Sequence, residues 1–334
     1  MNRLHGKTVV GVLFFTLFAV CARAQQQPCK GAVVPATITF RDGKPVPGID
    51  AKSLKAKIGR KSAEVMAAGP DNNPRRVVLV VDTGKEMNKD GWKVAMAMSN
   101  AIVNNARAVD SFALLTYAGA KEAIPFGATN DAVREKLAAL DATRPPIEGK
   151  GQEMGLYDGV SEALAMLGQP QFGDAILLFA ANPEEKGHAD IRKLEQTLLA
   201  RATRLIALSL TQRPLPAVRD TVLTYTPKDE IATGFTTDQL RSLALETGGL
   251  FYLENTQPTD SEYKLTDAHL KDLMKQGMQM YIVAVRVYRI EVGAPATAKL
   301  ENLELEPKDE LRKQASQILI LHPSQIAACG LTVP

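Results

Sequence analysis

The chain has 334 residues, of which 45% are hydrophobic and 23% charged, enough for one sizeable core and a smaller module. Its 40 basic residues nearly balance its 37 acidic residues. Binding to nucleic acid depends on neutralising phosphates and leaves a basic excess, so the composition excludes nucleic acid as a partner.

The first residues are typical of a secretory signal. Arg3 and Lys7 give a positive start, Val9 to Val20 form an apolar stretch, and Ala22-Arg23-Ala24 supplies a cleavage pattern. We expect residues 1–24 to be removed as a signal peptide, which takes away three basic residues and makes the two charges equal. The apolar stretch is short for a membrane helix, so we expect a secreted or periplasmic protein without a membrane span. An uncleaved anchor is the alternative.

Two cysteines remain after this cleavage, Cys29 and Cys329, one near each end. In an oxidising compartment such a pair is more often bridged than free. A bridge between them would close a loop of about 300 residues, and the chain-entropy model gives such a loop on the order of 5 kcal/mol. The alternatives are two free thiols or a bridge between chains.

Residues 25–73 are predicted to form an N-terminal β segment. Residues 36–44 alternate into an Asp-Gly turn, and residues 54–59 suggest a second strand. The run Gly69-Pro70-Asp71-Asn72-Asn73-Pro74 is expected to break local structure and to mark a domain boundary.

Strand and helix patterns alternate from residue 74 to residue 280. Repeated strand–helix units predict an α/β domain with a doubly wound, mostly parallel sheet and helices on both faces. The expected strands are residues 77–81, 111–117, 123–126, 176–179, 205–210 and 250–253, and the expected helices begin near residues 89, 130, 156, 191 and 237.

The hydrophobic period changes to two from Tyr281 onwards. Residues 281–292 read as one long strand, residues 298–305 as another and residues 317–321 as a third. These strands need a partner face, and the N-terminal segment is the nearest candidate. We therefore expect residues 281–334 to pack with residues 25–73 as one small β module, held by a Cys29–Cys329 bond.

Asp82 is the most informative residue for function. A β-branched and aliphatic strand ends in this aspartate on a glycine turn, and a helical pattern follows directly. The carboxylate therefore lies at the carboxyl end of a buried parallel strand, where open α/β sheets place their ligand sites.

The residues around Asp82 resemble the first strand and metal loop of a von Willebrand factor type A domain. Further landmarks follow in the family's order, namely Gly-Leu-Tyr-Asp-Gly-Val at 155–160, a central strand at 174–179 and a late helix with a Gly-Gly stop at 240–249. The opening strands are similar to those of the secreted group of such proteins common in acidobacteria. The resemblance implies a Rossmann-like fold over roughly residues 74–280 and a function in protein binding.

The cation site of the family does not carry over. The family reads Asp-x-Ser-x-Ser at this loop and adds a threonine and a second aspartate from two later loops. Here Gly84 and Glu86 replace the serines, Met154 replaces the threonine, and Ala180-Ala181 replaces the Asp-Gly pair. Methyl and thioether groups supply no oxygen ligands to a hard cation. We expect Asp82 to cap the turn or the following helix instead, with no metal and no cofactor bound.

The sequence thus predicts a non-enzymatic module that binds an unknown protein partner without a cation. No nucleophile–base pair is visible, which argues against an enzyme. The residues expected to contact the partner are Lys85, Glu86, Met87, Met154 and Asn182.

Two other readings stay open. A cation-dependent adhesion module would use Asp82 and Glu86 with non-standard ligands. Alternatively, this loop face is an inert surface, and binding occurs elsewhere, including on the β module.

Overall fold

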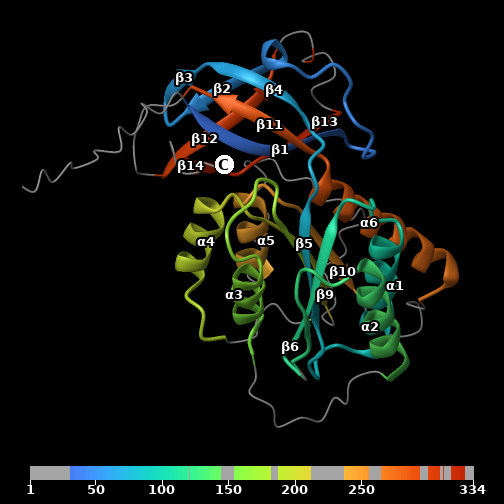
Figure 1. The fold of residues 1–334 in the computed structure, drawn as a ribbon. Helices are drawn as coiled ribbons and strands as arrows, with labels where there is room; N and C mark the ends of the chain where they lie inside the picture. Colours follow the sequence, from blue (N-terminus) through green and yellow to red (C-terminus); the bar gives the residue numbers. More distant parts are fainter. Residues whose placement is uncertain are drawn as a thin grey trace, which may run out of the picture.

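The computed structural model describes residues 31–119, 121–143, 154–181, 187–211, 237–255, 265–293, 300–308, 311 and 317–327. The expected signal peptide, both cysteines of the expected bridge and Asn182 lie outside these residues. Figure 1 shows an α/β unit (76–285) with a smaller β module (31–71 with 287–327) at one end of its sheet.

The sheet of the α/β unit has six strands in the order β10-β9-β8-β5-β6-β7. All neighbours are parallel except β7, which lies antiparallel at the edge. The first strand of the unit, β5, lies in the middle of the sheet. Strands β6 and β7 follow on one side of it, and β8, β9 and β10 follow on the other side, as in doubly wound folds. The strands are β5 (Arg76–Asp82), β6 (Ser111–Tyr117), β7 (Ala123–Ile124), β8 (Ala175–Ala180), β9 (Arg204–Thr211) and β10 (Phe251–Asn255).

Helices cover both faces of this sheet (Figure 1), which confirms the predicted fold class. Helices α1, α2 and α6 pack on one face, and α3, α4 and α5 pack on the other. The single tryptophan, Trp92, is buried in the first of these two cores. The helices are α1 (Lys89–Asn104), α2 (Asn130–Thr143), α3 (Leu156–Met166), α4 (Ile191–Ala200), α5 (Thr237–Glu246) and α6 (Asp267–Val285).

The β module consists of two antiparallel sheets, β13-β1-β11-β4 and β14-β12-β2-β3. Each sheet combines strands from both parts of the chain, and their inner faces share one apolar core. The prediction that the two end segments pack together is therefore confirmed, whereas the disulfide stays a prediction. The elements are β1 (Ala32–Phe40), η1 (Ala51–Ser53), β2 (Leu54–Ile58), β3 (Lys61–Ala63), β4 (Val65–Asp71), β11 (Val287–Val292), β12 (Leu300–Pro307), β13 (Ile318–Leu321) and β14 (Gln325–Ala327).

The long strand predicted over residues 281–292 is wrong in its first part. Tyr281 to Val285 form the last turn of helix α6, and the strand begins only at Val287. Buried Leu273, Gly277, Met280 and Ala284 recur at helical spacing, and this tertiary packing outweighs the β-branched composition of the segment. No helix within the described part of the chain is long and apolar enough to cross a membrane.

The boundary predicted at residues 69–74 is also wrong in part. Gly69, Pro70 and Asp71 belong to strand β4, which pairs with β11. Strand β4 lies at the edge of its sheet, where a proline removes no hydrogen bond from a second neighbour. The actual break is confined to residues 72–75, before strand β5.

Candidate functional site

The carboxyl ends of the parallel strands form the end of the α/β unit that lies away from the β module (Figure 1). We call its described loops the crest, which comprises residues 82–88, 117–119, 154–158, 181 and 187–190. The reversal of strand order between β5 and β8 lies at the crest. In doubly wound sheets this switch point opens the crevice that receives the ligand.

Asp82 bridges the switch point with both oxygens of its carboxylate. The backbone N–H of Gly84 donates to Oδ1 at 2.7 Å, within the loop that follows β5. The backbone N–H of Ala181, which follows β8, donates to Oδ2 at 2.9 Å. The side chain is 1% exposed, so these are buried, charge-assisted hydrogen bonds that tie two neighbouring loops together. The prediction that Asp82 caps the turn is confirmed, whereas the first turn of α1 is capped by Asn88.

The loop after β5 is also fixed against the loop after β6. The backbone N–H and the hydroxyl of Thr83 both donate to the carbonyl oxygen of Tyr117, each at 2.9 Å. The two loops approach so closely that a Cβ on Gly119 would lie 2.5 Å from the carbonyl oxygen of Thr83. A Cβ on Gly84 would lie 2.9 Å from the Cβ of Ala118. A side chain at either position would therefore push the two loops apart.

A second carboxylate at the crest, that of Asp158, holds the far end of the loop that follows β8. It accepts the backbone N–H groups of His188 (3.0 Å) and Ala189 (2.7 Å) and, at the start of α3, that of Gly155 (3.2 Å). Desolvation raises the pKa of Asp158, but these hydrogen bonds outweigh it, and the net pKa lies below the usual value. The charged form therefore persists, and its contribution to stability is lost only as the pH falls through this lowered pKa.

The residues at the crest do not fit a divalent cation. Both oxygens of Asp82 already accept backbone hydrogen bonds, and the hydroxyl of Thr83 is directed to a carbonyl. Gly84 and Ala181 offer no side-chain oxygen, and Met154 packs against the core beneath α3. Within the residues that the structure describes, no group of three or more His, Cys, Asp or Glu side chains is placed to hold a metal ion. A hard cation needs six or more oxygen ligands, counting water.

The structure places the five predicted contact residues differently. Lys85 and Glu86 are exposed at the tip of the loop after β5. Met87 is 3% exposed and belongs to the core, so its side chain is not part of the surface. Met154 is half-buried, and Asn182 lies outside the described residues.

Sequence reasoning missed the roles of Thr83 and Asp158. Asp158 lies three residues after Gly155, which is the spacing of a carboxylate that reaches back to the start of a helix. That spacing could have identified the contact with Gly155. Its bonds to His188 and Ala189 join residues 30 and 31 positions apart, and no local pattern signals them.

The fold and site together define a doubly wound α/β protein in which an aspartate links the two loops at the switch point. No protein-family model and no curated protein matches the sequence. Similar solved structures include proximal thread matrix protein 1 from the mussel byssus, at 14% identity and a TM-score of 0.44, over 68% of this chain and 50% of that one. A von Willebrand factor type A protein from Catenulispora acidiphila aligns at 10% identity and a TM-score of 0.43, over 91% of this chain and 75% of that one.

BatB from Bacteroides thetaiotaomicron aligns at 14% identity and a TM-score of 0.39, over 61% of this chain and 98% of that one. The aligned part thus spans half the length of the mussel protein and nearly all of BatB. All three TM-scores lie below 0.5. The sheet order and the helix placement of this chain define its doubly wound fold.

Proposed function

We propose that this chain is a secreted or periplasmic, non-enzymatic module of the von Willebrand A type that binds a protein partner at its crest without a cation. The bridge from Asp82 to Gly84 and Ala181 carries the proposal, because it uses both oxygens of the one carboxylate that matches the family's cation site. The bridge also ties the loop after β5 to the loop after β8, on the two sides of the switch point where a doubly wound sheet would bind a small ligand. These crest loops are therefore held in fixed positions relative to each other.

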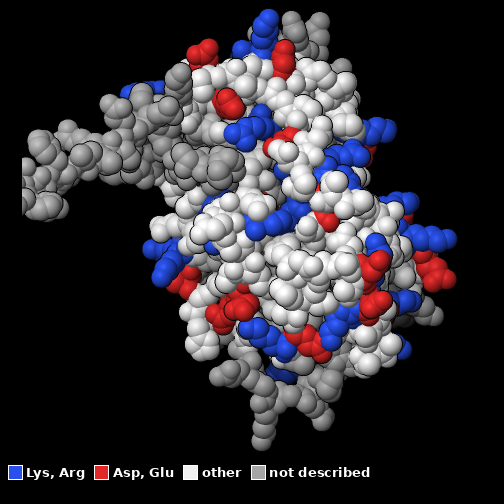
Figure 2. Space-filling model, in the orientation of Figure 1, with Lys and Arg blue, Asp and Glu red and all other residues white. Residues whose placement is uncertain are grey.

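The chemistry of the exposed residues supports a protein as the partner. Lys85 and Glu86 place opposite charges side by side at the tip of a loop that is anchored on both sides. Figure 2 shows Lys and Arg side chains interspersed with Asp and Glu over the face in view. Mixed charges of this kind suit a protein surface with the complementary pattern, whereas a polyanion requires a block of positive charge.

A charge reversal tests the proposal. The double variant Lys85→Glu/Glu86→Lys is expected to lose about tenfold or more of the capture of a native envelope or secreted partner, because charges at an interface rim control encounter and register. Capture by the unchanged protein should be the same with a chelator as with magnesium. The readout is quantitative capture of the same partner by each variant, followed by its affinity once the partner is purified.

Lys44→Glu is the matched control, because Lys44 is an exposed lysine in a turn of the β module and lies in an ion pair with Asp42. This variant should capture the partner like the unchanged protein. Capture that needs a divalent cation, or that survives the crest reversal, would contradict the proposal. The intact mass of the exported chain tests the signal peptide, with Gln25 expected as the first residue.

A further inference from the structure

Two connections join the α/β unit to the β module, and they lie side by side. One is the segment 72–75 between β4 and β5, and the other is Arg286 between α6 and β11. At the crossing, Asp71 of β4 is paired with Val287 of β11. Two adjacent connections between two units have the geometry of a hinge, about which the units could rotate.

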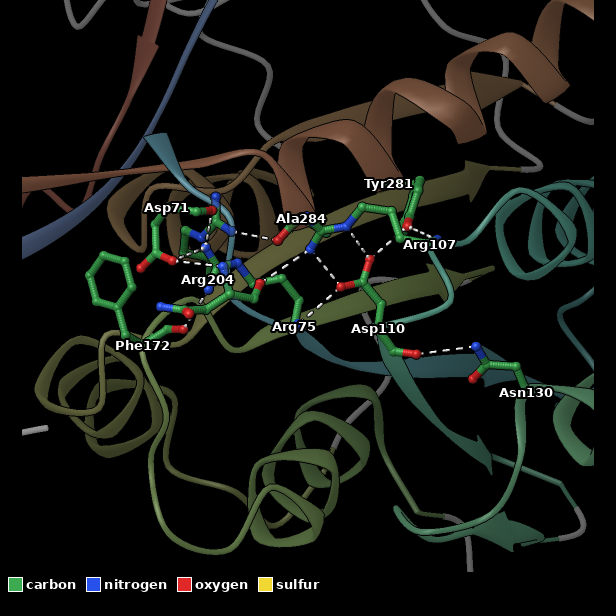
Figure 3. A network of polar contacts seen from close by, with 10 residues as sticks. Asp71, Arg75, Arg107, Asp110, Asn130, Phe172, Arg204, Tyr281 and Ala284 are labelled. Atoms are coloured by element: carbon green, nitrogen blue, oxygen red, sulfur yellow. Dashed lines mark hydrogen bonds and ion pairs between the residues drawn. The ribbon is translucent and has the colours of Figure 1, made fainter. Parts of the chain in front are cut away.

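Buried charges fix the first connection (Figure 3). The guanidinium of Arg75 donates to the carbonyl oxygen of Asp71 at 2.6 Å and forms an ion pair with its carboxylate at 3.2 Å. The backbone N–H of Arg75 donates to the carboxylate of Asp110 at 3.0 Å, and Arg107 donates to the carbonyl oxygen of Asn73 at 3.3 Å. Arg75 is 1% exposed. The short segment is therefore held at both ends and in its middle.

Arg204, the first residue of β9, fixes the second connection. Its fully buried guanidinium donates to the carbonyl oxygens of Val283 and Ala284, each at 2.7 Å, and to the hydroxyl of Thr37 in β1 at 2.9 Å. The two carbonyls belong to the last turn of α6, whose negative end favours a cation. One side chain of the α/β sheet thus contacts the end of α6 and a strand of the β module.

The two units also meet at a seam, where residues 322–324 of the β module lie on residues 246–248 at the end of α5. The backbone N–H of Ser324 donates to the carbonyl oxygen of Glu246 at 2.8 Å, and Thr247 forms a β-bridge with Pro323. Gly248 ends helix α5 with φ +76°, and a Cβ there would lie 2.5 Å from the backbone of His322 and Pro323. The chain of the β module therefore lies directly on the end of a helix of the α/β unit.

We propose that these contacts lock the hinge, so that the β module and the α/β unit form one rigid body that opens and unfolds as a single unit. The buried arginines hold the two connections, and the Glu246–Gly248 seam adds contacts next to Arg204, where the hydroxyl of Thr247 accepts the backbone N–H of Leu205 at 3.1 Å. The lock presents the crest at a fixed orientation relative to the β module.

Hydrogen exchange of the full chain tests this lock. Backbone amides of β1 and β11 report on the β module, and those of β5 and β8 report on the α/β unit. With increasing denaturant, both pairs of strands should lose protection at the same concentration, because cooperative units exchange through one opening. Loss of protection in β1 and β11 at a lower denaturant concentration would overturn the proposal.

A pair of glycine variants isolates the seam. Gly168 ends helix α3 with φ +59° and has open space around it, whereas Gly248 lies against the β module. Gly168→Ala and Gly248→Ala therefore introduce the same kind of backbone strain, but only the second displaces the seam. We expect Gly168→Ala to shift all four strands together. Gly248→Ala should make β1 and β11 exchange about tenfold or more faster than β5 and β8, and coincident exchange in this variant would overturn the role of the seam.

Discussion

Replacing Asp110 by alanine is expected to lower the free energy of unfolding by about 3 kcal/mol, the low end of the range for breaking a buried ion pair. The Asp110 carboxylate is buried and accepts four hydrogen bonds (Figure 3). The donors are the backbone N–H of Arg75 (3.0 Å), two nitrogens of Arg107 (2.8 and 2.6 Å) and the hydroxyl of Tyr281 (2.8 Å). The side chain of Arg107 is 35% exposed, so water can solvate its charge once the carboxylate is removed. This solvation keeps the loss of stability at the low end of the range.

Denaturant unfolding followed by the fluorescence of Trp92 measures this loss, because the tryptophan is the only one in the chain and lies in the α/β core. Asp272→Ala is the matched control. Asp272 also pairs with a basic residue three positions away, Lys275, but both side chains are exposed, and the change should stay within about 0.5 kcal/mol. A loss below about 1 kcal/mol for Asp110→Ala would show that the buried network does not stabilise the fold.

Replacing Asp82 by alanine is expected to destabilise the protein by about 2–4 kcal/mol, since two buried backbone N–H groups lose their acceptors. These are the N–H groups of Gly84 and Ala181. Asp82→Asn keeps one acceptor oxygen and should lose less stability than Asp82→Ala. If Asp82 served to bind a ligand instead, its replacement by alanine would leave the stability unchanged or raise it, because functional carboxylates commonly cost stability.

The same unfolding measurement separates these outcomes. Glu86→Ala serves as the control, because Glu86 lies four residues away on the same loop and is exposed, and its change should be within about 0.5 kcal/mol. An Asp82→Ala protein as stable as the unchanged chain would show that the carboxylate does not hold the crest together.

The strands of the α/β unit could be predicted from sequence almost to the residue. Strand β6 has the predicted bounds, and β5 and β8 extend the predicted runs by one residue at each end. A continuous β-branched and aliphatic run between turn residues is typical of a strand that is buried on both faces. These strands are buried in this way, because helices cover both faces of the sheet. The prediction was wrong at Tyr281 to Val285, where β-branched residues complete a helix packed on the core, and at Gly69 to Asp71, where an edge strand accepts glycine and proline.

The site could be predicted only where its contacts are local. The bond from Gly84 to Asp82 spans two residues and follows from the turn. The bond from Ala181 to Asp82 spans 99 residues and depends on the pairing of β5 with β8. The hinge contacts were not predictable at all, because Arg204 begins an apolar strand without any charge pattern, and its partners are a hydroxyl and two helix-end carbonyls.

We infer that two backbone amides hold the carboxylate of Asp82 and that the described residues around it supply too few oxygen ligands for a cation. Calorimetric titration of the chelator-treated chain with magnesium, calcium and manganese tests it most directly, with melting curves recorded alongside. We expect no heat beyond dilution and a melting shift under about 1 °C for each ion. Saturable binding of one ion per chain that disappears in Asp82→Asn would contradict it.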